Sequence, residues 1–276
     1  MLECFSLCVR ASWRRLLVNL DMRLEPGEFL AVLGENGAGK TTLLRALAGE
    51  PLAPLRSSGR VTLAGRPIHA WSARERARLR AVLPQHTDLA FAFTAEEVAR
   101  LGRYPHGGTA VDDALIAARA LQMADAEHLA QRDVATLSGG ERARVFLAAV
   151  LAQLWETESD QPRFLLLDEP TAALDLAHQH HLLATAREFA ATRGLGMLAI
   201  LHDLNLAAQY ADRVLVLRDG GLLAQGAPRE VLTPALIAEG FAVAASVLAH
   251  PLKPAPLIAT AQRSSFLLAE RATCDG

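Results

Sequence analysis

The stretch FLAVLGENGAGKTTLLRALAG, residues 29–49, constrains the fold of this chain more than any other feature. An apolar run predicts a buried strand, a glycine-rich loop follows it, and leucines at helical spacing predict a helix. The loop fits the pattern Gly-x-x-x-x-Gly-Lys-Thr, in which bare backbone N–H groups curl around phosphate oxygens. Because strand, loop and helix occur in the order that this motif requires, we predict a nucleotide phosphate site rather than a chance glycine turn.

The predicted nucleotide contacts run along this loop into the first turn of the helix, whose positive end favours an anion. We expect the Lys40 ammonium to reach the β- and γ-phosphates of ATP, and the Thr41 hydroxyl to hold Mg²⁺. Leucines at helical spacing should face the core, and Gly49 should end the helix. The predicted phosphate-binding residues are Gly34, Glu35, Asn36, Gly37, Ala38, Gly39, Lys40, Thr41 and Thr42.

The apolar runs along the chain favour an α/β fold. Short β-type runs at 29–33, 80–83, 164–168, 197–201 and 214–217 alternate with helix-like stretches. Continuous apolar strands separated by helices are typical of a parallel sheet that is covered on both faces. The first 28 residues indicate short antiparallel strands around turns instead.

The remaining segments suggest a helical insert and a C-terminal extension. Residues 87–136 contain three helical patterns, including DAEHLAQRD, with no strand between them, so we expect a helical subdomain inserted over about 87–150. After Gly226, the segment APREVLTPALIAEGF predicts one helix, and the apolar, proline-containing residues 242–260 predict short strands or turns. We place one domain at 1–242 and a C-terminal extension with a loose tail at 243–276.

The composition excludes several classes of protein. The 276 residues carry a net charge of −2, which gives no indication of a nucleic-acid backbone as partner. The three cysteines, Cys4, Cys8 and Cys274, match neither a zinc spacing nor a secreted disulfide framework. No window reaches the ~18 unbroken apolar residues of a spanning helix, and the N-terminus lacks a signal-peptide pattern. We therefore expect a chain that does not cross the membrane but can dock on a protein that does.

Polar residues that follow the predicted parallel strands complete a hydrolytic site. Asp168 ends the buried run FLLLD, at the sheet edge where open α/β proteins bind ligands, and we expect it to hold Mg²⁺. Glu169 is the candidate to polarise the attacking water. Gln85 and His202 each follow another strand. We expect Gln85 to sense the γ-phosphate or its metal, and His202 to contact the γ-phosphate.

A second phosphate cradle is predicted at ATLSGGERARVFLAAVL, residues 135–151. Ser138 is a good N-cap for the helix that follows, but a capped helix does not explain Gly139 and Gly140, which weaken a helix interior by about 1 kcal/mol each. Two glycines suit a phosphate that approaches bare backbone. The phosphate can belong to a second copy of the chain, so that ATP bound at the glycine loop of one copy is covered by this helix of the other.

This set of motifs resembles the ATP-binding cassette (ABC) ATPases over roughly residues 2–240. GENGAGKT looks like their Walker A motif, Gln85 like the Q-loop, LSGGE like the signature motif, FLLLDEP like Walker B, and His202 like the switch histidine. The resemblance implies a P-loop NTPase core with an antiparallel β subdomain and a helical insert. It also implies that Asp175 belongs to a D-loop at the nucleotide and that an aromatic residue, for which Trp13 is the candidate, stacks on adenine. An exposed surface tryptophan is the competing interpretation of Trp13.

Within this family, the insert FAFTAEEVARLGRYPH is similar to that of importers of iron chelates, heme and vitamin B12. The segment PRFLLLDEPTAALDLAHQHHLL looks most like the ATPases of bacterial heme importers. The resemblance implies two copies of this chain on two permease subunits at the cytoplasmic face of the inner membrane. A periplasmic heme-binding protein would deliver the cargo, and ferric siderophores and vitamin B12 are the alternative cargoes.

Other interpretations of the sequence stay open. A soluble ABC protein of chromosome, repair or translation type would share the motifs, although no coiled-coil heptads and only one cassette occur here. A nucleotide kinase would explain the glycine loop but not LSGGE. The cluster His178, His180 and His181 invites a heme-ligand hypothesis, but a solvated polar helix face is the simpler interpretation.

Overall fold

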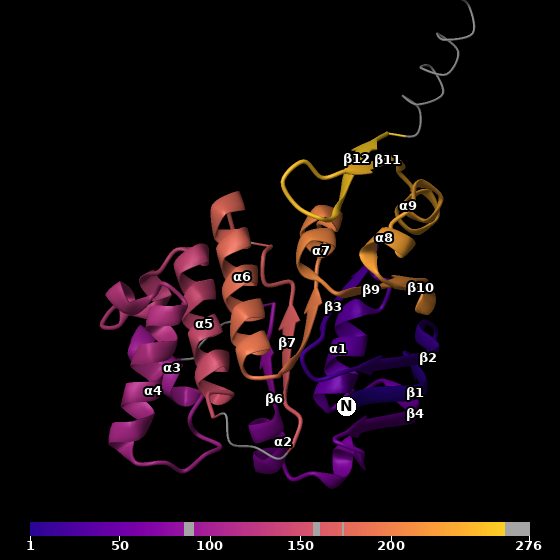
Figure 1. The fold of residues 1–276 in the computed structure, drawn as a ribbon. Helices are drawn as coiled ribbons and strands as arrows, with labels where there is room; N and C mark the ends of the chain where they lie inside the picture. The colour runs from indigo at the N-terminus through magenta and orange to yellow at the C-terminus, as the bar shows by residue number, and fades with distance from the viewer. Residues whose placement is uncertain (86–90, 157–160, 173, 263–276) are drawn as a thin grey trace, which may run out of the picture.

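The computed structural model describes residues 1–85, 91–156, 161–172 and 174–262, which form two packed sheets, surrounding helices and a C-terminal hairpin (Figure 1). The predicted loose tail with Cys274, and the first residues of the predicted insert, lie outside these ranges.

The larger sheet confirms the predicted parallel core. Its strands are β3 (Phe29–Gly34), β6 (Arg80–Leu83), β7 (Phe164–Asp168), β8 (Gly196–Ile200), β9 (Arg213–Arg218) and β10 (Gly221–Gly226). Their order is β10-β9-β3-β8-β7-β6, and all neighbours are parallel except β10, which pairs antiparallel with β9. The five predicted apolar runs therefore form five adjacent strands, with their carboxyl ends at one edge.

The smaller sheet is antiparallel, as the N-terminal pattern predicts. It contains β1 (Leu2–Arg10), β2 (Arg15–Leu24), β4 (Arg56–Leu63) and the short β5 (Arg66–Pro67), in the order β2-β1-β4-β5. Residues 11–14 form the turn between β1 and β2. Its inner face packs on α1 (Lys40–Ala48), whose Leu43, Leu44 and Leu47 are buried as expected.

The two faces of the parallel sheet carry different layers. Alternate strand residues such as Leu30, Val32 and Leu166 pack with α1 and the antiparallel sheet in one core. Their neighbours, such as Ala31 and Leu165, pack with the other helices in a second core. Consequently α1 lies on one face of the sheet, whereas α5 (Gly139–Gln153) and α6 (Leu176–Thr192) lie on the other (Figure 1).

The helical insert consists of α3 (Ala95–Leu101), α4 (Ala110–Met123) and α5. The helix predicted from DAEHLAQRD is wrong, because Asp125 adopts φ 53° after α4 and leaves only a 3₁₀ turn, Glu127–Leu129. The buried Arg103 connects the insert: its guanidinium donates to Asp113 Oδ1 (3.0 Å) and Ala152 O (2.8 Å) and pairs with Glu156. A further 3₁₀ turn, Val134–Thr136, precedes α5 in the insert, whereas the turn Ile68–Ala70 and α2 (Ala73–Leu79) lie between the antiparallel sheet and β6.

The segment after Gly226 contains two helices, α8 (Pro228–Val231) and α9 (Pro234–Phe241), instead of the single predicted helix. Pro234 forces Thr233 out of the helical region, and the Thr233 hydroxyl then caps α9. Strands β11 (Ala244–Ala249) and β12 (Pro256–Ala261) form a hairpin, in agreement with the predicted short strands.

This hairpin packs on α7 (Leu204–Tyr210), where the Asn205 side chain donates to Ile258 O (3.0 Å) and accepts from Ile258 N (2.8 Å). Among the described residues, no helix combines the length and apolar character needed to cross a bilayer.

Candidate functional site

The loop between β3 and α1 is shaped by glycine. Gly34, Gly37 and Gly39 have positive φ angles of 145°, 81° and 101°. A Cβ on Gly34 would lie 2.3 Å from Leu217 O, and one on Gly39 would lie 2.4 Å from Leu16 O, so backbone contacts exclude any side chain there. The N-cap residue of α1 is Gly39, which has no side chain to cap the helix, so the first backbone N–H groups can face an anion.

Lys40 lies within this loop rather than in solvent. Its ammonium donates to Gly34 O (2.8 Å) and Glu35 O (3.0 Å), and only 5% of the residue is exposed. Burial lowers the pKa of this ammonium, while the charges of Glu169 and Asp168 oppose that effect. The loop therefore holds a buried cation that a phosphate can pair with, and two carboxylates whose charges act on the same ammonium.

Two of the predicted metal contacts, Thr41 and Asp168, meet at the edge of the sheet where β3 and β7 end. The Thr41 hydroxyl donates to Asp168 Oδ1 at 3.3 Å. Asp168 is 5% exposed, and burial, with the charge of Glu169, raises the pKa of its carboxyl to about 6. A hydroxyl and a buried carboxylate are oxygen donors of the kind that Mg²⁺ prefers, so these two residues fit a magnesium ion.

Glu169 lies between the two polar residues that follow neighbouring strands. Gln85 Nε2 donates to Glu169 Oε2 at 2.7 Å, and His202 Nε2 lies 2.7 Å from Glu169 Oε1. Glu169 has φ 50°, a left-handed conformation that is strained for a residue with a side chain. The structure thus brings Gln85 and His202, which were predicted to act at the γ-phosphate, to Glu169, which was predicted to polarise the attacking water. Gln85 contacts this carboxylate rather than Thr41 or Asp168.

The turn between β1 and β2 carries Trp13 next to Arg14, which contacts the phosphate loop. The tryptophan is 84% exposed. Its neighbour Arg14 donates from Nη2 to Gly37 O at 3.2 Å, a contact that the sequence analysis missed because no motif marks an arginine in a turn. An exposed aromatic ring one residue from this contact is well placed for a base whose phosphates lie in the loop.

The helix that begins after Ser138 is capped as its sequence predicts. Glu141 N donates to Ser138 Oγ (3.3 Å), and Ser138 N donates to the Glu141 carboxylate (2.8 Å), which completes a capping box. Of the predicted apolar stripe, Val145 and Val150 are buried, whereas Phe146 and Ala149 are only half-buried. Ser138 caps α5 and the glycine loop precedes α1, and these two helices lie on opposite faces of the parallel sheet.

The histidine cluster does not converge on one point. Asp175 caps α6 by accepting from His178 N (3.0 Å) and also lies 2.7 Å from His178 Nδ1. His180 Nδ1 lies 2.9 Å from the Tyr210 hydroxyl, and His181 is exposed. In the described part of the chain, no group of three His, Cys, Asp or Glu side chains could hold a metal ion.

Taken together, the loop, the carboxylates and the polar residues can bind a nucleotide phosphate, hold a divalent cation and direct a water molecule at the sheet edge. Comparison with known protein families agrees with this chemistry. The family model described as ABC transporter matches residues 17–172.

Individual relatives extend the similarity to nearly the whole chain. The hemin import ATP-binding protein HmuV of Gloeobacter violaceus is 52% identical over 97% of this chain and 96% of its own. A solved inward-facing metal-chelate type ABC transporter is 25% identical, with a TM-score of 0.77 over 96% of this chain and 98% of its own. The dimeric bacterial ABC transporter cassette MJ0796, at 23% identity, has a TM-score of 0.73 over 83% of this chain and 99% of its own.

Proposed function

The chain belongs to the ABC transporter family and carries its ATPase domain, and from this premise we propose that it is the ATP-hydrolysing subunit of a bacterial importer of hemin. The observation that carries the proposal is the Glu169 carboxylate, which Gln85 and His202 hold beside the phosphate loop. The choice of hemin depends on the relatives that are named for hemin import. Ferric siderophores and vitamin B12 are the alternative cargoes for the same role.

ATP is proposed to bind with its triphosphate in the glycine loop, residues 34–42. There Lys40 exchanges its hydrogen bonds to two loop carbonyls for bonds to the β- and γ-phosphate oxygens, which are better acceptors because they are charged. Trp13 stacks on the adenine. Thr41 and Asp168 would hold Mg²⁺, which would supply positive charge next to the γ-phosphate.

Glu169 is proposed to accept a proton from the attacking water. Gln85 contacts one oxygen of the Glu169 carboxylate and His202 contacts the other. These two contacts hold the carboxylate in one orientation and so restrict the direction from which it can accept the proton. When the γ-phosphate is present, both partners can turn from Glu169 toward it. In this way the site would respond to whether ATP or ADP is bound.

Two copies of the chain are proposed to enclose each ATP. The glycine loop precedes α1 on one face of the sheet, and the Ser138 helix start belongs to α5 on the other face. A head-to-tail pair therefore offers Ser138, Gly139 and Gly140 of one copy, with Asp175, to the γ-phosphate bound by its partner. ATP binding would close the pair and hydrolysis would reopen it.

The helical insert is proposed to dock on the permease at the cytoplasmic face of the inner membrane. Large apolar side chains are exposed here, including Tyr104 at 88%. Val111 and Leu115 are also exposed and lie one turn apart on α4. Such a group of exposed apolar residues is typical of a protein interface. Two permease subunits and a periplasmic heme-binding protein would complete the importer.

The test is cargo-dependent ATP hydrolysis by the reconstituted importer. The two ATPase copies and their permease are placed in liposomes with the periplasmic binding protein. We expect hemin to stimulate ATP hydrolysis more than a ferric siderophore or cobalamin, and the Glu169→Gln importer to show no stimulation. If another cargo stimulates ATP hydrolysis as much as hemin or more, that cargo is the substrate instead of hemin. If no cargo stimulates ATP hydrolysis, the importer role is refuted.

A further inference from the structure

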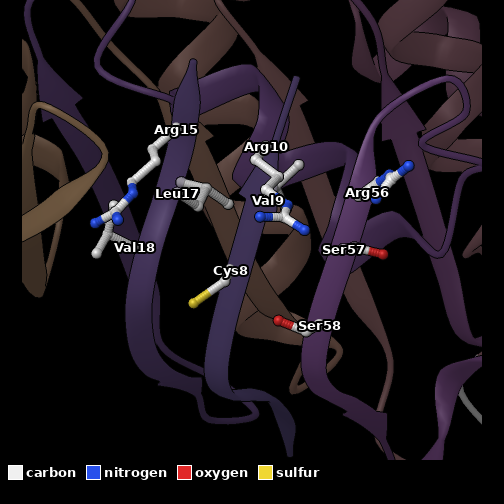
Figure 2. Close-up of a pocket in the computed structure, with 9 residues that line it drawn as sticks. All are labelled: Cys8, Val9, Arg10, Arg15, Leu17, Val18, Arg56, Ser57 and Ser58. Atoms are coloured by element: carbon white, nitrogen blue, oxygen red, sulfur yellow. The ribbon is translucent and has the colours of Figure 1, made fainter. Parts of the chain in front are cut away.

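A pocket of about 720 Å³ opens on the outer face of the antiparallel sheet, opposite the face that packs on α1 (Figure 2). Its lining comes from three adjacent strands, β2, β1 and β4. The volume lies within the range of ~300–1,000 Å³ that is common for small-molecule sites. None of the residues predicted to bind phosphate or metal lines this pocket.

Three arginines form a row across the pocket. Arg10 on β1 is directly paired with Arg15 on β2 and with Arg56 on β4, so the three side chains stand on the same side of neighbouring strands. Like charges at directly paired positions destabilise a sheet. Within the part of the chain that the structure describes, none of the three guanidinium groups forms a hydrogen bond or an ion pair with a protein group. The row therefore has donors available to an external anion.

The rest of the pocket is different in character. Cys8 and Val18 supply apolar surface, and Ser57 and Ser58 supply hydroxyl groups, whereas Val9 and Leu17 are buried core residues. An inorganic anion would use the arginines but leave this apolar surface in contact with water. A ligand with an apolar body and acidic groups would cover both.

We propose that this pocket binds a small organic anion: an apolar ring system that carries at least two acidic groups. The arginines would donate charge-assisted hydrogen bonds to the acidic groups, and Val18 and Cys8 would contact the ring. Two sources provide this chemistry, a nucleoside polyphosphate and the porphyrin dicarboxylate of hemin. Only the porphyrin source rests on the proposed function.

Occupancy of this pocket would act on the ATP site. Arg10 and Arg15 flank the turn of residues 11–14, which carries Trp13 and the Arg14 contact to Gly37. A ligand that fixes Arg10 and Arg15 therefore restricts the turn that supports the adenine and the phosphate loop. If the ligand is the porphyrin, the imported cargo would change the rate of ATP hydrolysis by the importer that delivers it.

The test follows the exposure of the Cys8 thiol, because Cys8 lines the pocket whereas Cys4 is buried. A Cys274→Ser, Lys40→Ala protein leaves Cys8 as the accessible thiol and weakens nucleotide binding at the phosphate loop. The rate of maleimide labelling is measured by mass spectrometry with ATP, with protoporphyrin, or with protoporphyrin dimethyl ester. Equilibrium dialysis of the same probes gives their affinities independently of the thiol.

We expect at least one acidic probe to slow labelling about fivefold or more at saturation, and the dimethyl ester to have no effect. The probe that protects Cys8 identifies the source. In Arg10→Gln/Arg56→Gln protein its affinity should fall by about tenfold or more, the loss typical of hydrogen bonds to charged groups. Arg23→Gln, on β2 but outside this pocket, should leave it unchanged.

The proposal would be overturned if neither acidic probe bound or protected Cys8. It would also be overturned if the protecting probe bound the Arg10→Gln/Arg56→Gln protein as tightly as the protein with both arginines. Protection by ATP alone would support the pocket even if the reconstituted importer failed to respond to hemin. The two proposals can therefore fail separately.

Discussion

Replacing Asp168 with asparagine should stabilise the nucleotide-free protein while it removes a ligand for Mg²⁺. The Asp168 carboxyl is buried, and its pKa is raised from 3.8 to about 6. A raised pKa means that the folded state holds the proton more tightly than the unfolded state. Stability is therefore lost as pH rises from about 4 to about 6, and the full penalty is present above pH 6.

The size of this penalty follows from the shift. A difference of about two pH units corresponds to about 3 kcal/mol. Asparagine removes the charge, but its buried amide N–H groups still lose hydrogen bonds to water, so we expect Asp168→Asn to gain less than this value, about 1–2 kcal/mol at pH 8. Asparagine retains an oxygen that can accept from the Thr41 hydroxyl, so the variant loses no hydrogen bond there.

The assay is urea unfolding of both proteins in EDTA, without nucleotide, at pH 5 and pH 8. We expect the gain to be larger at pH 8 than at pH 5, and Mg²⁺ with ATP to stabilise the wild type more than the variant. Asp175→Asn is the control, because hydrogen bonds from His178 lower the pKa of that carboxyl, so its replacement should not stabilise the protein. A gain that does not grow with pH, or a loss at pH 8, would refute this reasoning.

Three further substitutions test separate parts of the molecule. Lys40→Ala should weaken ATP binding by about tenfold or more, as measured by equilibrium dialysis, because the loop loses its buried cation. Trp13→Ala should weaken binding of ATP about tenfold, whereas Trp13→Phe should retain most of the affinity; equal affinity in all three proteins would exclude stacking. Asn205→Ala should cost about 1–3 kcal/mol of local stability, because the Ile258 backbone loses both partners, and faster amide exchange in β12 would report it.

The parallel core and the residues at its edge were predictable because each depends on a local pattern. Short continuous apolar runs that alternate with helical patterns, such as 164–168, favour strands buried on both faces, and the polar residues after them are then brought to one edge. The glycine loop was equally clear, since its conformation excludes side chains at Gly34 and Gly39.

Features that depend on distant contacts or on backbone detail were not predictable. The Arg14 contact to Gly37 joins residues 23 positions apart, and no local pattern marks it. The helix expected from DAEHLAQRD fails because Asp125 takes a left-handed conformation that propensity alone does not indicate. The arginine row arises only when β1 pairs with both β2 and β4, a register that the sequence does not reveal.

The mass of the Glu169→Gln protein in Mg²⁺ and ATP tests the central claim, that two copies of the chain enclose the nucleotide. Sedimentation equilibrium should show a dimer with ATP and a monomer with ADP, and Ser138→Arg in the same background should restore the monomer. A Glu169→Gln protein that binds ATP but stays monomeric at high concentration, and that does not pair when it is bound to its permease, would contradict the account.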